Sequence, residues 1–205
     1  SILINLKYHH DENFTGKPVA GCMKSQAVIT QEAAEALRNV QEDLVMSGYS
    51  LVIYDAYHPQ KTYNQFNEWL EEEDSYEIKN TYYPNIKKPG LTGYIKEKYA
   101  HVRGSTIDVT IISLKDKLLS PCKKQKRSYK GQKDIVYMSD NSLDMGTSYD
   151  VFDPLSVFEN NNIPEAARDN RILLRKNMQN HEFIPNNKCW WQFTLVRDTS
   201  IDSKF

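Results

Sequence analysis

Two apolar runs rich in β-branched residues constrain this chain most. The first, SLVIYDAY, covers residues 50–57 and has a polar end, and the second, STIDVTII, covers residues 105–112. Runs of this length and composition are typical of buried strands. We therefore expect both runs to lie inside the main sheet of the fold.

Helical and strand patterns surround these two runs. We expect a helix over residues 31–47, capped by Thr30 and stopped by Gly48, with its apolar residues on one face. Further helices are expected over residues 60–72 and 165–180, and further strands in LINLKY and in CWWQFTLV, residues 3–8 and 189–196. Residues 73–97 contain Pro84, Pro89, Gly90 and Gly93, and are expected to be irregular. This order favours an α+β fold, with helices packed on a mostly antiparallel sheet.

Length and charge narrow the class of protein. A chain of 205 residues suits one domain, and its formal net charge of −1 gives no reason to expect nucleic acid as a partner. No apolar run approaches the roughly 18 residues that a membrane-spanning helix needs. The N-terminal sequence SILINLKYHH does not resemble a signal peptide. Whether the chain is cytoplasmic, or exported after removal of a leader, stays open.

Two further features concern the cysteines and a basic stretch. Three cysteines, Cys22, Cys122 and Cys189, do not form a disulfide framework, although a Cys22–Cys122 bridge stays open. A basic stretch around SPCKKQKRSYKGQK predicts an insertion at about residues 115–135. A solvated loop or hairpin is the plainer interpretation, and a polyanion-binding patch is the alternative.

One motif points to metal chemistry. His101 precedes Asp108 by seven positions. Successive side chains of a strand alternate between its faces, so the Arg103–Gly104 pair must supply a turn if the two are to meet. A catalytic zinc ion usually has three protein ligands. The pair is therefore a partial site, and a surface histidine beside a paired aspartate is the plainer interpretation of these two residues alone.

Three further residues, in two segments of the chain, are candidates for function. His58 lies at a strand-to-helix turn, where functional side chains often occur, although a helix-start residue without a chemical role is equally consistent. Cys189 and Gln192 flank the tryptophan pair Trp190 and Trp191, which is typical of core aromatics.

Six ordered motifs resemble those of the VanX-type D-alanyl-D-alanine dipeptidases, zinc peptidases related to D,D-carboxypeptidases and the hedgehog fold. They are LKYHHDENFTGKPV (6–19), YDAYHPQ (54–60), YAHVRGSTID (99–108), DMGTSYD (144–150), NRILL (170–174) and CWWQF (189–193). The resemblance implies a single domain over residues 1–205, with a central, mostly antiparallel sheet, helices packed on one side and a site in a cleft. It also implies a small peptide substrate, of the D,D-dipeptide kind found in peptidoglycan.

The resemblance also assigns roles to residues. It implies that His101 and Asp108 bind zinc. The third zinc ligand of the family, a histidine, corresponds to Gln192, and its catalytic glutamate corresponds to Cys189. Its oxyanion-stabilising arginine corresponds to His58. A neutral amide is a weak zinc ligand, and a thiol does not reproduce a carboxylate base.

Three more residues are candidates for substrate binding on the same resemblance: Tyr99, at the position of a family serine, Asp144, which matches a family aspartate, and Trp190. A fixed positive charge at an oxyanion is worth about 3–4 kcal/mol, so its loss at His58 weakens catalysis further. Ordinary dipeptidase turnover by the family mechanism is therefore not expected.

Three hypotheses stay open at this point. In the first, Cys189 is a nucleophile, His101 its base, Asp108 the group that orients the base, and Gln192 an oxyanion donor. In the second, Cys189 replaces the missing third zinc ligand. In the third, the chain is a catalytically inactive homologue that binds a peptide or cell-wall fragment, or that binds a partner through the basic insertion.

Overall fold

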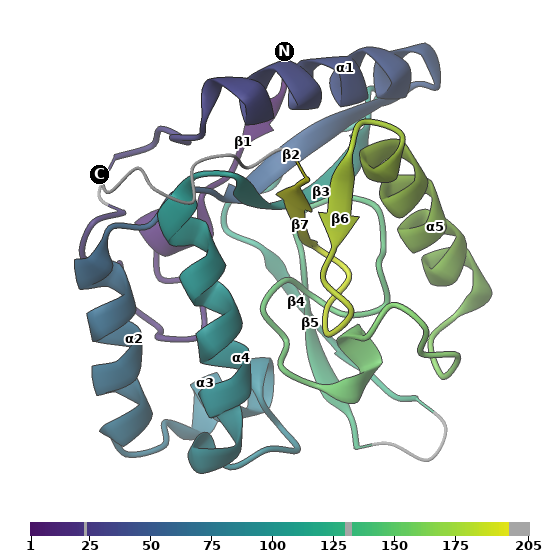
Figure 1. The fold of residues 1–205 in the computed structure, drawn as a ribbon. Coiled ribbons are helices and arrows are strands. Elements are labelled where there is room, and N and C mark those ends of the chain that lie inside the picture. Colours follow the sequence, from purple (N-terminus) through teal and green to yellow (C-terminus); the bar gives the residue numbers. More distant parts are fainter. Residues whose placement is uncertain (23, 130–132, 197–205) are drawn as a thin grey trace.

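The computed structural model describes residues 1–22, 24–129 and 133–196, and Figure 1 shows its α+β architecture. A five-stranded sheet has the order β1-β2-β3-β7-β6, and a separate two-stranded hairpin pairs β4 with β5. The sheet strands are β1 Leu3–Ile4, β2 Tyr49–Asp55, β3 Thr106–Ser113, β6 Phe183–Pro185 and β7 Gln192–Leu195. The α-helices are α1 Gln31–Met46, α2 Gln60–Glu71, α3 Tyr76–Tyr82, α4 Thr92–Lys98 and α5 Glu165–Gln179.

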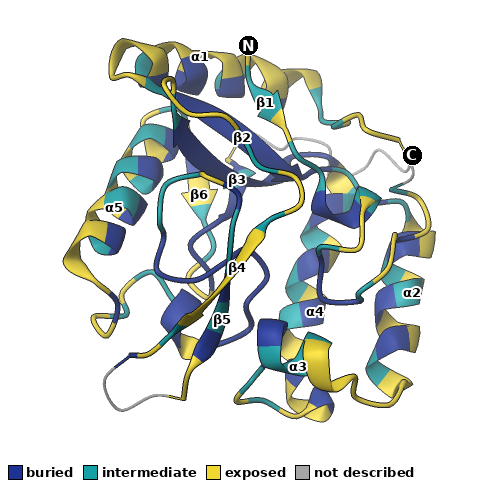
Figure 2. Ribbon diagram, turned by 180° about the vertical axis from the view of Figure 1, so that it is seen from behind, coloured by how far each residue is buried: buried dark blue, intermediate teal, exposed yellow. Residues whose placement is uncertain are grey.

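The sheet is mixed but mostly antiparallel. β1 runs parallel to β2, and the pairs β2–β3, β3–β7 and β7–β6 are antiparallel. Figure 2 shows β2 and β3 buried along their length. Both faces of these two strands are covered. The β2 sequence is accordingly a nearly continuous apolar run, whereas β3, TIDVTIIS, alternates polar and apolar residues over its first half.

Two groups of helices flank the sheet. α1 contacts β2, α5 contacts β6, and α1 and α5 contact each other, so these two helices complete the main hydrophobic core. The α1 helix begins as predicted, with the Thr30 hydroxyl accepting a hydrogen bond from the Ala33 N–H at 3.2 Å. The helices α2, α3 and α4 instead lie to the other side of the molecule and contribute to a second apolar cluster, so the predicted one-sided packing describes only part of the fold.

The expectation of irregular structure over residues 73–97 was wrong. This segment contains α3 and most of α4, each of seven residues. Helices this short are not stable by propensity alone. Tyr82, Tyr83 and Ile95 are buried in the second apolar cluster, and this packing across the chain stabilises the two helices.

Three strand expectations also change. The N-terminal strand ends at Ile4, and a 3₁₀-helix follows at Lys7–His9. β6 was not predicted. The last strand begins only at Gln192, so Cys189 and the two tryptophans precede it in the chain.

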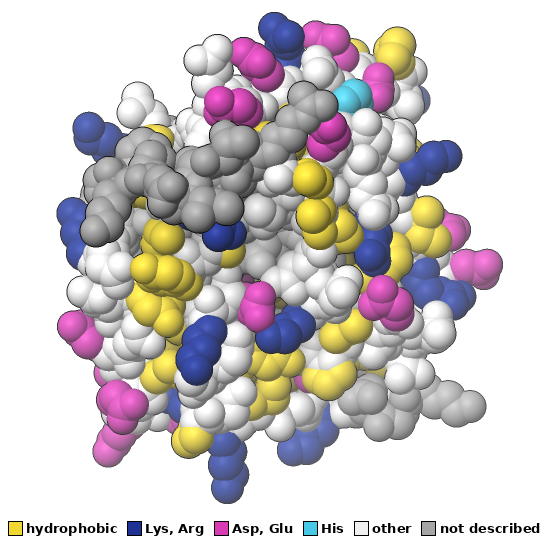
Figure 3. Space-filling view, viewed as in Figure 1, with side chains coloured by type: hydrophobic (Ala, Val, Ile, Leu, Met, Phe, Trp, Pro, Cys, Tyr) yellow, Lys and Arg dark blue, Asp and Glu magenta, His cyan; other side chains and the backbone are white. Residues whose placement is uncertain are grey.

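The basic region forms a hairpin, β4 Lys123–Arg127 with β5 Ile135–Ser139, and residues 130–132 between them are outside the described part. β4 is exposed (Figure 2). Its basic residues have acidic partners: Lys124 pairs with Glu77, Lys126 with Asp134 and Arg127 with Asp144, at 2.6–2.7 Å. On the face shown in Figure 3, acidic and basic side chains are interspersed.

Two expectations about the whole chain can be compared with the structure. None of the helices within the described ranges has the length and apolar character that crossing a membrane requires. Cys22, Cys122 and Cys189 are all free thiols.

Candidate metal centre

Strand register places three polar side chains in one row across the sheet. Asp108 on β3 lies opposite Asp55 on β2 and opposite Gln192 on β7. Residues directly opposite each other in an antiparallel pair point to the same face. A register shift between Ile53 and Asp55 turns Asp55 to the face of Asp108, which is a usual effect of a β-bulge beside a functional site.

His101 joins this row from the short 3₁₀-helix Tyr99–Arg103, which follows α4. Gly104 ends this helix with φ of 73°, and the chain then enters β3. Few side chains tolerate this left-handed conformation, so the predicted turn depends on glycine. As a result, His101 Nε2 lies 3.2 Å from Asp108 Oδ1, and His101 Nδ1 lies 2.8 Å from the Ala56 carbonyl oxygen.

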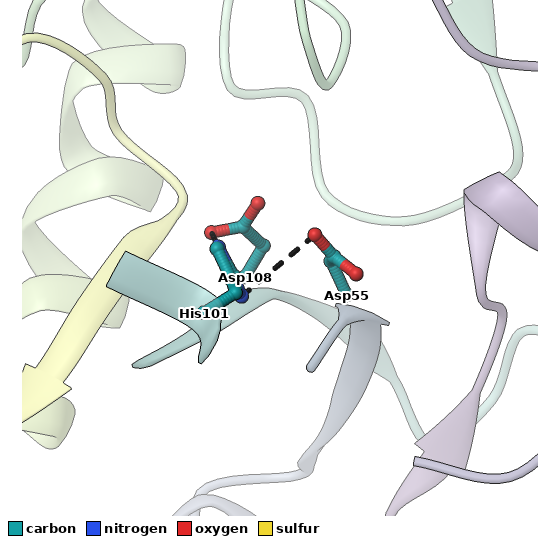
Figure 4. A group of neighbouring side chains, drawn as sticks. All are labelled: Asp55, His101 and Asp108. Atoms are coloured by element: carbon teal, nitrogen blue, oxygen red, sulfur yellow. Dashed lines mark ion pairs between the residues drawn. The ribbon is translucent and has the colours of Figure 1, made fainter. Parts of the chain in front are cut away.

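Asp55, His101 and Asp108 form a buried group that could hold a metal ion, since each offers one ligand atom and these atoms lie within 4.8 Å of one another (Figure 4). Asp55 Oδ2 is 3.7 Å from the His101 ring. Among the residues that the structure describes, Asp55 Oδ2 and Asp108 Oδ1 are buried without a hydrogen-bond donor. Buried carboxylate oxygens left in this state are costly, and a bound cation would satisfy them.

Gln192 contacts the same nitrogen of His101. Its Nε2 lies 3.1 Å from His101 Nε2, and its Oε1 accepts a hydrogen bond from Asn186 Nδ2 at 2.6 Å. The orientation of Asn186 is fixed in turn, because its Nδ2 donates to Glu97 Oε2 and its Oδ1 accepts from the Lys188 N–H. The Gln192 amide therefore presents N–H groups, not its oxygen, to His101.

Comparison with known proteins places the chain in a family. A family model described as D-ala-D-ala dipeptidase matches residues 1–121 and 130–205. The D-alanyl-D-alanine dipeptidase of Enterococcus faecium is 32% identical over 97% of this chain and 88% of its own length. Those of Streptomyces coelicolor and Escherichia coli are each 29% identical, over 97% and 96% of this chain and 88% and 80% of their own lengths. The chain belongs to the D-Ala-D-Ala dipeptidase family.

The donor set suits the zinc ion that this family uses. Imidazole nitrogen and carboxylate oxygen are both common zinc ligands. The His101 Nδ1 hydrogen bond to the Ala56 carbonyl leaves Nε2 as the lone-pair nitrogen, and this arrangement is typical of a metal-binding histidine. The described residues thus fit a metal ion at Asp55, His101 and Asp108, provided that the Gln192 amide moves away from Nε2.

A buried lysine balances part of the acidic charge. Lys98 Nζ lies 2.9 Å from Asp108 Oδ2 and 2.7 Å from Asp150 Oδ1. Burial alone would lower the pKa of Lys98, but these two carboxylates raise it above its ordinary value. Burial would raise the pKa of Asp108, but Lys98 and His101 hold it well below its usual range. Burial raises the pKa of Asp150 to about 6, against the effect of Lys98.

The pKa values of the two histidines of the centre shift in opposite directions. Burial would lower the pKa of His101, yet Asp108 and Asp55 raise it above its ordinary value. Burial lowers the pKa of His58, in spite of its 2.7 Å contact with Asp55. The two rings stack with centroids 4.9 Å apart. A neutral His58 does not supply the permanent positive charge of an arginine.

Cys189 is buried near the same charges. Burial and the Asp108 carboxylate raise the pKa of its thiol well above the ordinary value, so it is protonated at neutral pH. The described polar partners of the His101 ring are Ala56, Asp55, Asp108 and Gln192, and the His58 ring stacks on it. These contacts lend no support to a Cys189–His101 pair, whose role stays a prediction.

The three predicted substrate-binding residues have different surroundings. Tyr99 is 46% exposed and stacks edge-on with Tyr63. Asp144 pairs with Arg127 and accepts a hydrogen bond from the Gly146 N–H. Trp190 is buried, and its indole N–H donates to Thr147 at 2.9 Å.

Sequence reasoning missed three residues of the centre. Asp55 and Asp150 both lie inside motifs quoted above, YDAYHPQ and DMGTSYD, so an acidic residue in each motif was the available signal. No sequence pattern indicated Lys98, because it lies just outside the motif that begins at Tyr99 and because lysine side chains are usually exposed.

Proposed function

We propose that this chain is a hydrolase of small dipeptides of the D-Ala-D-Ala class, with a metal-binding centre made by Asp55, His101 and Asp108, and with slow turnover. The observation that carries the proposal is the convergence of these three buried side chains, two of which hold unpaired oxygens. In this proposal Asp55 is the third ligand, and it lies on the other side of Asp108 from Gln192, which corresponds to the third histidine ligand of the family.

A cavity beside Asp55 supports a small substrate. It has a volume of about 340 Å³, and its lining includes Tyr8, Cys22, Asp55 and Tyr57, with Lys24 and Lys61. Pockets of this size hold small ligands. The two lysines suit the carboxylate end of a dipeptide, and Asp55 joins the cavity to the metal-binding group.

The residues of this chain have separate tasks in the proposed reaction. Asp55, His101 and Asp108 would hold the metal ion, which when bound polarises a carbonyl group and makes a water molecule more acidic. The Ala56 carbonyl oxygen keeps the His101 ring in orientation. Tyr149 and Lys98 both donate hydrogen bonds to Asp108 Oδ2, which leaves Oδ1 for the metal.

Slow turnover follows from the groups at two positions. A protonated Cys189 thiol is not a general base, and general bases contribute about 10²–10⁴-fold to rate. A neutral His58 gives less oxyanion stabilisation than a cation, and one such group is worth about 10²–10³-fold. We therefore expect kcat at least about 10⁴-fold below that of family members with the glutamate and the arginine.

The test is release of D-alanine from D-Ala-D-Ala, measured by a coupled amino-acid oxidase assay in buffer with zinc at known free concentration. We expect slow, zinc-dependent release that disappears in His101→Ala and in Asp55→Asn. Release that is unchanged in both variants, or that does not depend on metal, would contradict the proposal.

A non-catalytic, peptide-binding role is the second candidate. It is favoured by the Gln192 amide, whose N–H groups lie against the nitrogen that a metal would use. In this case calorimetry would detect binding of D-Ala-D-Ala to the wild type, while no D-alanine would form at any zinc concentration. Loss of binding in Asp55→Asn would place the ligand at this cavity.

The Cys189 hypotheses can be separated from both candidates. If Cys189 is a nucleophile or a zinc ligand, Cys189→Ala loses the turnover or the bound zinc of the wild type. We expect Cys189→Ala to keep both, because the thiol is buried and protonated.

A further inference from the structure

Lys98 is a fully enclosed cation at the edge of the candidate metal centre. Its side chain is 3% exposed, and its ammonium group contacts Asp108 Oδ2, Asp150 Oδ1 and the Tyr149 hydroxyl at 2.7–3.0 Å. The ammonium also lies over two aromatic rings, 5.4 Å from the centroid of Tyr8 and 4.8 Å from that of Tyr149. Acceptors and ring faces thus surround this charge.

Asp108 connects Lys98 to the metal-binding group. One carboxylate oxygen, Oδ2, accepts from Lys98, and the other, Oδ1, faces His101 Nε2 at 3.2 Å. A cation bound at Oδ1 would therefore share one carboxylate with a lysine ammonium. Two positive charges on opposite oxygens of one buried carboxylate repel strongly, because little water is present to screen them.

The formal charges of the centre can be compared directly. Three carboxylates, Asp55, Asp108 and Asp150, are opposed by the single ammonium of Lys98, so two formal negative charges remain when both histidines are neutral. A divalent cation matches this remainder. Without Lys98, the same centre would hold three negative charges and would attract a divalent cation more strongly.

We propose that Lys98 is an internal cation that limits how tightly the Asp55, His101 and Asp108 group binds a divalent metal ion. The inference rests on the metal-binding part of the proposed function. In this arrangement the Lys98 ammonium stabilises the metal-free protein, because it balances part of the acidic charge. The same ammonium repels a divalent metal ion that binds beside it. Lys98 is a positioning residue, since it acts through Asp108.

The experiment measures zinc affinity by competition with a chromophoric chelator, in the wild type, Lys98→Gln and Lys98→Met. Both substitutions remove the charge, and glutamine keeps hydrogen-bonding groups beside Tyr149 and Asp108. We expect each variant to bind zinc at least tenfold more tightly than the wild type, a change of about 1.4 kcal/mol. In each background, His101→Ala must abolish this binding, which separates the centre from surface sites.

Two further variants keep the proposal testable if removal of Lys98 prevents folding. Asp150→Asn keeps the ammonium and removes a negative charge beside it, so zinc should bind more weakly than in the wild type. Lys88→Met serves as the matched control. Lys88 is a buried lysine that donates to the Trp69 and Glu72 carbonyl oxygens, and its loss should lower stability without changing zinc affinity.

The outcomes separate this inference from the proposed function. Equal zinc affinity in the wild type and both Lys98 variants would overturn the role of Lys98 and leave the metal centre intact. Zinc binding by the Lys98 variants alone would support the inference, even if the wild type showed no hydrolysis. Absence of zinc binding in all proteins would overturn both the inference and the metal-dependent reaction.

Discussion

At the scale of single residues, the side-chain amide of Gln192 contacts His101 Nε2, the nitrogen that a metal ion would use. Its Nε2 lies 3.1 Å from that nitrogen, and Asn186 holds the amide oxygen on the other side. Histidine at this position would offer a ring nitrogen in place of amide N–H groups. Imidazole is a strong zinc ligand.

We therefore expect Gln192→His to bind zinc at least roughly tenfold more tightly than the wild type, or about 1.4 kcal/mol. The measurement is the same chelator competition. Gln192→Leu is the matched control, because it removes the amide N–H groups without adding a ligand atom. If the leucine variant gained as much affinity as the histidine variant, relief of the blocked nitrogen would explain the effect and ligation would not.

Glu12 provides a second residue-scale prediction, away from the centre. It accepts hydrogen bonds from the Cys122 N–H at 2.6 Å and from Lys7 at 3.4 Å. Burial would raise the pKa of Glu12, but these donors lower it below its ordinary value of 4.5. The stabilisation is thus present above pH 4.5 and is lost as the pH falls through the lowered value.

Glu12→Gln should lower the free energy of unfolding at pH 7 by about 1–2 kcal/mol. The difference from the wild type should shrink as the pH falls below 4.5, which urea titrations at a series of pH values would measure. Glu77→Gln is the control, since Glu77 is an exposed partner of Lys124. A difference that grew toward low pH would contradict the sign of this argument.

At the scale of elements, α5 holds the segment that carries Asp150. The buried Arg171 guanidinium donates to the carbonyl oxygens of Met145, Leu155 and Val157 at 2.7–2.8 Å. Three backbone acceptors on both sides of Asp150 are thus satisfied by one side chain of the helix. Burial lowers the pKa of Arg171 to about 10, so it is still charged at neutral pH.

Arg171→Met should lower the free energy of unfolding by about 2–4 kcal/mol, because three buried carbonyl groups lose their donor. Lys176→Met, at an exposed position of the same helix, should change it by less than about 0.5 kcal/mol. Urea unfolding followed by tryptophan fluorescence measures both. Similar losses in the two variants would show that Arg171 acts only through helix propensity.

The elements that the sequence predicted are those whose own pattern is strong. The helix at 31–46 has an N-cap, an apolar face and a glycine stop. The strand β2 is a nearly continuous apolar run, and β3 is rich in β-branched residues. α3 and α4 could not be predicted, since each is seven residues long and depends on distant aromatic partners. The hairpin strand β4 carries almost only basic residues, KKQKR, which gives no strand pattern.

The centre was predictable only in part for a similar reason. His101 and Asp108 lie within one motif, and the turn at Gly104 that joins them follows from local geometry. Asp55 enters the group through a register shift in a pairing between distant strands. Lys98, the last residue of α4, enters through its contact with Asp108 of β3, and neither event has a local sequence pattern.

At the scale of the whole molecule, the basic hairpin forms ion pairs with acidic residues from other parts of the chain. Its partners include Glu77 of α3 and Asp144 of the segment after β5. Non-specific binding of polyanions depends on uncompensated positive charge that releases counterions. These ion pairs reduce the uncompensated positive charge of the hairpin, and the absence of a nucleic-acid partner stays a prediction.

We expect no binding of heparin or of a 20-nucleotide single-stranded DNA at 150 mM salt, up to protein concentrations of about 100 µM. Fluorescence anisotropy of the labelled DNA measures this directly. A double variant, Glu77→Gln with Asp144→Asn, would release two basic partners and should bind more tightly than the wild type. Salt-sensitive binding by the wild type would instead favour a role of the hairpin in recognising polyanions.

The burial of Cys189 has a practical consequence. Its thiol is 8% exposed within the main core, whereas Cys22 and Cys122 lie nearer the surface. A thiol reagent can therefore modify Cys189 only when the last strand opens, and the rate of its modification reports how often this happens. In a Cys22→Ser, Cys122→Ser background, the rate of thiol labelling measures how often the segment around Cys189 opens. Slower labelling on addition of zinc would show that a bound ion suppresses this opening.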